Sequence, residues 1–142
     1  MIIDRDAIEH RVVYWMANYY QVNGIFIFAG NIDPPENDKL KTQKMTFPYA
    51  GIHNGNGFLV YPGPKPSIRL KVLRDGIEDY WYLTETARLA KSLKNQQEAK
   101  QLLNETRSEI FVDPHYFNRN PEGILAYRKK LAEFIEVATK KK

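Results

Sequence analysis

The sequence predicts a helix-rich α/β chain with two short parallel strands and about four helices. Two short apolar runs, residues 25–29 and 58–61, each follow a glycine, and such runs are typical of strands buried on both faces. The second run stops at Pro62 and is followed, from Ser67 on, by a long segment with helical periodicity. A strand followed by a helix forms a βα unit, and the strands of such units pair in parallel with others of their kind.

Length and composition agree with one globular domain. The chain has 142 residues, of which 43% are hydrophobic and 27% are charged, as in globular proteins rather than in disordered or membrane proteins. No apolar run approaches the roughly 20 residues that span a bilayer, so no membrane partner is expected. We expect a single domain over residues 1–142, with C-terminal helices that begin at about residue 94. The sequence leaves the cellular location open.

Charge and side-chain chemistry argue against several functions. The net charge is +4, and three of the positive charges belong to the closing residues 140–142. A basic tail without interleaved aromatic residues does not predict a nucleic-acid partner. The chain has no Cys, which excludes disulfides and thiol catalysis, and its three His residues are widely separated. We therefore expect neither a metal site nor a cofactor.

The first predicted helix spans residues 6–21. Asp6 and Glu9 have the spacing of a capping box, and Asn23 with Gly24 ends the helix. Its predicted buried face consists of Ile8, Val12, Trp15, Met16 and Tyr19.

The central helix begins after Ser67, whose hydroxyl is predicted to cap it. One face is predicted to pack on the sheet, and it comprises Leu73, Ile77, Tyr80, Trp81, Thr84 and Ala87. Two residues do not fit a simple amphipathic pattern. We interpret Arg69 as reaching past the apolar stripe into water, and Gly76 as allowing another backbone to come close.

Charged residues of the central helix form a predicted structural network. Its members are Arg69, Arg74, Asp75, Glu78 and Asp79. The three acidic residues lie on the face opposite the apolar stripe, so we do not interpret them as catalytic. After this helix, residues 94–111 form a further predicted helix, ended by Asp113 and Pro114. A last helix has Asn120 as its N-cap and Pro121 at its first position.

Several segments resemble a known family. They are Arg11-Val12-Val13-Tyr14-Trp15, Asn23-Gly24-Ile25-Phe26-Ile27-Phe28-Ala29-Gly30, Asn54-Gly55-Asn56-Gly57-Phe58-Leu59-Val60-Tyr61-Pro62-Gly63 and Pro66-Ser67-Ile68-Arg69-Leu70-Lys71-Val72-Leu73-Arg74-Asp75-Gly76-Ile77-Glu78-Asp79-Tyr80. Together they resemble the C-terminal part of the catalytic domain of glycoside hydrolase family 123, also catalogued as domain of unknown function 4091. The resemblance implies about the last quarter or third of a (β/α)-barrel, followed by C-terminal helices.

A barrel needs about 250 residues, so the resemblance implies strands with open edges. Such edges recruit partners, and the expected partner is the rest of a barrel domain or a second copy of the chain. In a barrel, the loops that leave the strands carry the ligand contacts. The candidate glycan-binding residues are Asn31, Asp33 and Tyr61 at this rim, and His53 and Asn54 in the long connection before the second strand. Turn formation explains the polar residues of the loop equally well.

The implied function is hydrolysis of glycans that contain N-acetylhexosamine, of the β-N-acetylgalactosaminide type. The family uses an adjacent Asp-Glu pair on an earlier barrel strand, and this chain contains no Asp-Glu dipeptide. We therefore assign no catalytic residue and expect no activity from the chain alone. The alternative is a non-catalytic module that binds a glycan or another subunit through the aromatic residues Tyr49, Tyr61 or Trp81, although Trp81 is expected to lie in the core.

Overall fold

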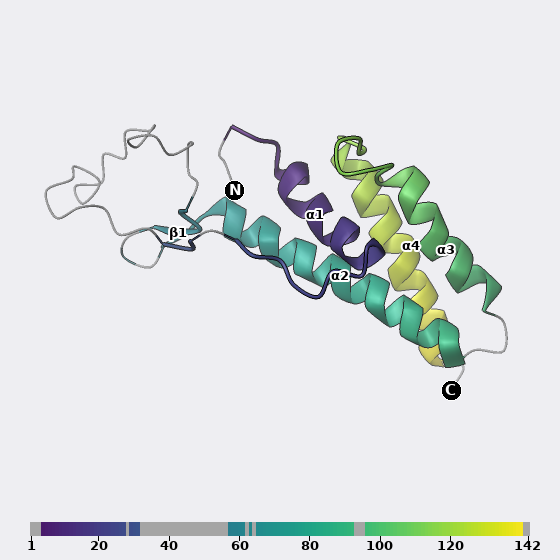
Figure 1. The fold of residues 1–142 in the computed structure, drawn as a ribbon. Helices are drawn as coiled ribbons and strands as arrows, with labels where there is room; N and C mark the ends of the chain where they lie inside the picture. Colours follow the sequence, from purple (N-terminus) through teal and green to yellow (C-terminus); the bar gives the residue numbers. More distant parts are fainter. Residues whose placement is uncertain are drawn as a thin grey trace, which may run out of the picture.

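The structure, a computed structural model, describes residues 4–27, 29–31, 57–61, 63, 65–92 and 96–140. It is helix-rich, and its four helices are α1 (Ala7–Tyr19), α2 (Ile68–Ser92), α3 (Gln97–Glu109) and α4 (Pro121–Lys140). The predicted helix content is thus confirmed. Figure 1 shows α2 as the long central helix, with α1 along its first half and with α3 and α4 beside its second half. None of the helices in these described ranges has both the length and the apolar character needed to cross a membrane.

The described strands are antiparallel, whereas the sequence predicted parallel ones. β1 (Val60–Tyr61) pairs with β2 (Lys65–Pro66) in a short hairpin at the N-terminal end of α2 (Figure 1). Residues 25–27 lie in no strand. Ala29 has a φ of 50°, a left-handed conformation that a β-strand cannot accommodate, and it turns the chain before Asn31 meets Phe58 in an antiparallel bridge.

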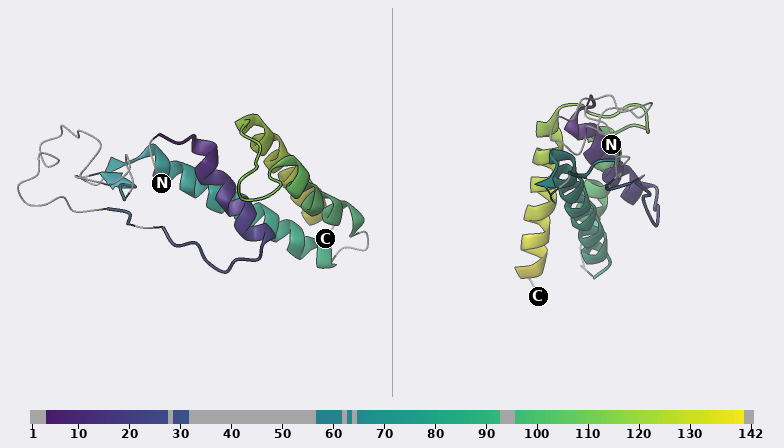
Figure 2. Two further views of the ribbon diagram at one scale, coloured as in Figure 1. Left: turned by 45° about the horizontal axis from the view of Figure 1, so that its top comes forward. Right: turned by 90° about the vertical axis from the view of Figure 1, so that its left-hand side faces the viewer.

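The core lies between the helices, whose arrangement Figure 2 shows in two further views. Its main cluster consists of Ile8, Val12 and Trp15 from α1, Leu83 from α2, Ile110 and Phe111 after α3, and Ile124, Tyr127 and Leu131 from α4. A second cluster joins Leu89 and Ala90 of α2 to Ala99 of α3 and to Phe134 and Ala138 of α4. Residues from both ends of the chain therefore share one apolar core.

The predicted buried face of α2 is wrong. Ile77 is 41% exposed and Trp81 is 65% exposed, whereas Asp79 and Leu83 on another face are buried. The sequence pattern places Asp79 on the solvent side because carboxylates are rarely buried without partners. In the structure, however, neighbouring helices provide those partners.

Gly76 faces a side chain of α1 rather than another backbone. A Cβ atom at this position would overlap the ring of Tyr14, with the ring atom Cε2 only 2.9 Å away. Glycine therefore allows α1 and α2 to pack closely at this crossing.

The helix caps agree with the sequence in two of three cases. Ser67 Oγ accepts a hydrogen bond from the Leu70 N–H (3.3 Å), and Asn120 Oδ1 accepts one from the Glu122 N–H (3.0 Å), as predicted. Asp6 occupies the N-cap position of α1, but its side chain forms no capping hydrogen bond there. The predicted capping box is therefore wrong, and Glu9 binds Arg119 instead (2.6 Å).

Candidate functional site

Two of the candidate glycan-binding residues lie in one small hydrogen-bonded unit. Asn31 forms its bridge with Phe58, and the carbonyl oxygen of Gly30 accepts hydrogen bonds from the N–H groups of Leu59 (2.8 Å) and Val60 (3.0 Å). Tyr61 follows directly in β1. The unit lies at the N-terminal end of α2 (Figure 1). The other candidates, Asp33, His53 and Asn54, lie outside the described residues.

Arg69 of α2 fastens this unit to the helix. Its Nη2 donates hydrogen bonds to the carbonyl oxygen of Phe58 (2.5 Å) and to the hydroxyl oxygen of Tyr61 (3.0 Å). Its Cζ lies 5.7 Å from the centroid of the Tyr61 ring. The residue is only 5% exposed, so the interpretation that it reaches into water is wrong. Arg69 instead orients the phenol of Tyr61.

The charge of Arg69 has no described counter-ion. None of the carboxylates in the described residues lies within 4.0 Å of the guanidinium. Its Nε is buried without a hydrogen-bond partner. A buried cation is costly unless it is paired, and the two neutral acceptors satisfy it only in part. This is the one such unsatisfied side-chain atom among the described residues, and it marks the Arg69–Tyr61 unit as unusual.

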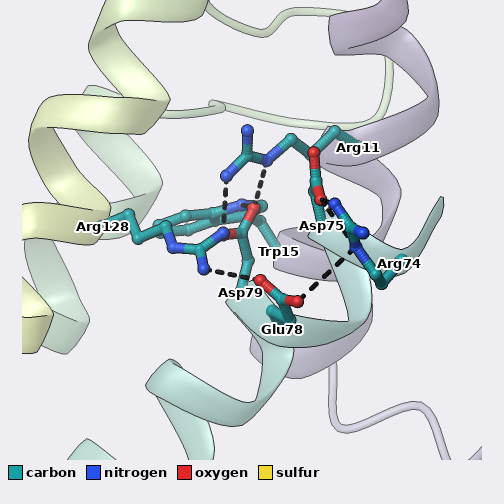
Figure 3. A network of polar contacts seen from close by, with 7 residues as sticks. All are labelled: Arg11, Trp15, Arg74, Asp75, Glu78, Asp79 and Arg128. Carbon is teal, nitrogen blue, oxygen red and sulfur yellow. Dashed lines mark hydrogen bonds and ion pairs between the residues drawn. The ribbon is translucent and has the colours of Figure 1, made fainter. Parts of the chain in front are cut away.

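A second polar cluster surrounds Asp79, which is 0% exposed (Figure 3). Arg11 of α1 binds both carboxylate oxygens, through Nε at 2.5 Å and Nη2 at 2.9 Å. The indole Nε1 of Trp15 donates to the same carboxylate at 2.9 Å, and Arg128 Nη1 of α4 donates at 3.2 Å. Four donors from two other helices thus surround one carboxylate and hold α1, α2 and α4 together.

Arg128 extends the cluster toward the surface of α2. Its Nη2 donates to Glu78 Oε2 at 2.7 Å, and its Cζ lies 4.9 Å from the ring centroid of Tyr82. Burial disfavours its charge, but the hydrogen bond to Glu78 and the charge of Asp79 outweigh this and raise the pKa of Arg128. The exposed Arg74 pairs with Asp75 at 2.8 Å and with Glu78 at 3.6 Å (Figure 3).

The sequence did not reveal the partners of Asp79. Arg11 and Trp15 are one helical turn apart on α1, a spacing that places them on one face and is a weak signal. No sequence pattern relates Arg128 to Asp79, because 49 positions separate them. Arg69, which belongs to the same predicted network, lies elsewhere and binds the strand unit instead.

A cavity of about 560 Å³ lies apart from both clusters. It is lined by residues of α1 and of the turn just before it, of the segment 25–27 and of the turn before α4, namely Arg5, Glu9, His10, Val13, Tyr14, Ile25, Phe26, Ile27, Phe117 and Arg119. Neither Asn31 nor Tyr61 lines it. Within the described ranges, no group of three or more His, Cys, Asp or Glu side chains is placed to hold a metal ion.

Fold and contacts together define a helix-rich domain in which a short strand unit is held on the first turn of a long helix. Comparison with protein-family models gives a match to the glycoside hydrolase 123 catalytic domain over residues 1–86. The chain therefore belongs to this family. The match includes α1, β1, β2 and most of α2, whereas α3 and α4 lie beyond it. No curated protein and no solved structure matches the chain.

Proposed function

We propose that the chain is the C-terminal part of a glycoside hydrolase domain that acts on N-acetylhexosamine glycans of the β-N-acetylgalactosaminide type. The observation that carries the proposal is the family match over residues 1–86. This range includes the strand unit with Asn31 and Tyr61 as well as Arg69. In the proposal, Asn31 and Tyr61 contact the sugar, with Asp33, His53 and Asn54 as further candidates.

The chain by itself is proposed to be inactive. Glycoside hydrolysis needs two suitably placed carboxyl groups, or one carboxyl group together with a group of the substrate. Asp79 is enclosed by four donors, and Glu78 is engaged by Arg128 and Arg74. No adjacent Asp-Glu pair occurs in the sequence. The catalytic carboxylates would then come from the rest of the barrel.

A binding experiment on the 142-residue chain tests the sugar contacts. In NMR titrations with N-acetylgalactosamine, we expect Asn31→Ala and Tyr61→Phe to weaken binding several-fold, since a neutral hydrogen bond contributes about 0.5–1.5 kcal/mol. His115→Ala is the control, because His115 is highly exposed at the turn before α4. Failure of the unaltered chain to bind would contradict the proposal.

An activity assay tests the absence of catalytic residues. We expect no release of phenol from an aryl β-N-acetylgalactosaminide by the chain alone. Release should occur once a polypeptide that carries the family's Asp-Glu pair is added. Turnover by the chain alone that Glu78→Gln abolishes would show that a catalytic carboxylate lies on α2.

A binding module is the second candidate function, and the exposure of Trp81 favours it. The indole is 65% exposed and lies one helical turn from the half-exposed Ile77, and flat exposed aromatic rings bind sugars or other subunits. The other tryptophan, Trp15, is fully buried. Acrylamide quenching of the intrinsic fluorescence therefore reports on Trp81. A glycan that reduces this quenching in the native chain without any turnover in the reconstituted enzyme would favour the module.

A further inference from the structure

Two basic side chains, Arg69 and Lys65, lie beside Tyr61 in the described residues. Arg69 is buried and has no carboxylate partner among the described residues, and Lys65 lies directly opposite Tyr61 in the hairpin. Cross-strand neighbours project from the same face of a hairpin. No described anion therefore offsets the positive charge around this phenol.

The first turn of α2 adds to this field. The helix has 25 residues and carries no acidic residue in its first turn. Its N-terminal N–H groups present a partial positive charge on the side of the helix that meets the hairpin. A helix N-terminus alone does not define a binding site. Here, however, it coincides with a guanidinium that is more than nine-tenths buried and whose Nε has no partner.

Tyr61 contacts the buried guanidinium of Arg69 and is itself partly exposed. Its hydroxyl oxygen accepts the hydrogen bond from Arg69 Nη2 at 3.0 Å, so the phenolic proton remains to be donated elsewhere. Donation from a cation polarises the hydroxyl and strengthens it as a donor. Tyr61 is only partly buried, in contrast to Arg69. Of these two side chains, Tyr61 is therefore the one that an external acceptor can approach.

We propose that Arg69 is a positioning residue that makes the Tyr61 hydroxyl, together with Lys65 and the first turn of α2, a binding site for an anionic group of a glycan. The chemistry that fits is a sulfate ester or a carboxylate, because a negatively charged oxygen is the strongest acceptor for a polarised hydroxyl and would lie near a guanidinium that has no carboxylate partner among the described residues. That the anion belongs to a glycan rests on the proposed function. The inference adds to that function a preference for acidic sugars over neutral ones.

The test compares N-acetylgalactosamine 6-sulfate with N-acetylgalactosamine by calorimetric or NMR titration of the 142-residue chain. We expect the sulfated sugar to bind about tenfold tighter, because a hydrogen bond to a charged group contributes more binding free energy than a neutral one. Arg69→Met and Tyr61→Phe should abolish the preference, and Arg69→Lys should retain part of it. Arg88→Met is the matched control, because Arg88 is an exposed arginine of the same helix that pairs with Glu85.

The outcomes separate this inference from the proposed function. Equal affinity for the two sugars would overturn the anion site and leave the glycan function intact. A preference that survives in folded Arg69→Met would overturn the role of Arg69. If neither sugar binds, the proposed glycan function is wrong. Inorganic sulfate at millimolar concentration then tests whether the anion site exists. Sulfate that raises the melting temperature of the native chain but not of Arg69→Met or Tyr61→Phe supports the anion site, and equal effects on all three overturn it.

Discussion

Asp79 illustrates, at the scale of single residues, how a buried carboxylate is compatible with a folded core. The interior disfavours an unpaired charge by several kcal/mol, but two arginines and an indole N–H surround both oxygens of Asp79. The two arginines come from different helices, α1 and α4. One side chain of α2 therefore fixes the relative positions of three helices, a role distinct from sugar binding.

Replacing Asp79 tests this role. We expect Asp79→Ala to lower the free energy of unfolding by about 3–5 kcal/mol, because Arg11 and Arg128 lose the shared carboxylate. Asp75→Ala is the control, since its exposed partner Arg74 should limit the loss to about 1 kcal/mol or less. Urea unfolding followed by circular dichroism measures both. Similar losses in the two variants would contradict the role assigned to Asp79.

Gly76 is the second position at which one atom decides the packing. Alanine favours a helix interior over glycine by about 1 kcal/mol, but at this position its methyl group would overlap the ring of Tyr14. We expect Gly76→Ala to destabilise the chain by about 1–3 kcal/mol, the usual range for overpacking. Gly24→Ala serves for comparison, because no atom lies within 4 Å of the methyl group that it would add. A more stable Gly76→Ala variant would disprove the close packing.

At the scale of elements, the helices beyond the family match complete the core of the matched part. Ile124, Tyr127 and Leu131 of α4 pack with Val12 and Trp15 of α1. Arg128 adds the polar contact to α2. The match ends at residue 86, within α2. The apolar core, however, also includes residues of α4. We therefore propose that α3 and α4 belong to the same folding unit, as the expected single domain over residues 1–142 requires.

Truncation tests this unity. A chain that ends after residue 92 lacks α3 and α4, and we expect it to lose cooperative unfolding and the near-ultraviolet circular dichroism of packed aromatic rings. A chain that ends after residue 138 retains Ala138, the last buried residue of the described range 96–140, and should unfold like the full chain. Cooperative unfolding of the shorter chain would show that residues 1–92 fold independently.

At the scale of the whole molecule, large apolar side chains are exposed to solvent. Phe26 is 89% exposed, and Trp81 is exposed on α2. Residues 22–31 carry no charge, and uncharged segments of high β-propensity associate with other chains when they are exposed. These features support the proposal that the rest of a barrel or a second copy of the chain covers this surface.

Sedimentation equilibrium tests that proposal. We expect the purified chain to show a concentration-dependent increase in mass, and Phe26→Ser together with Trp81→Ser to reduce it. Exposed positions tolerate polar substitution, so both variants should remain folded. Leu125→Ser, at another half-exposed position on α4, is the control. A strictly monomeric native chain over the whole concentration range would contradict association between copies.

The sequence alone determined the number of helices, most helix limits, the caps at Ser67 and Asn120, and the family, because these depend on local periodicity, capping chemistry and matching segments. Only the tertiary structure decided the pairing of the strands, the buried face of α2 and the partners of Asp79 and Arg69. The left-handed backbone at Ala29 redirects the chain before the bridge at Asn31. The orientation of α2 follows from donors on α1 and α4 that lie far away in the sequence. Local patterns carry no information about such distant partners, and for a buried charge the partners decide which side of the helix faces the core.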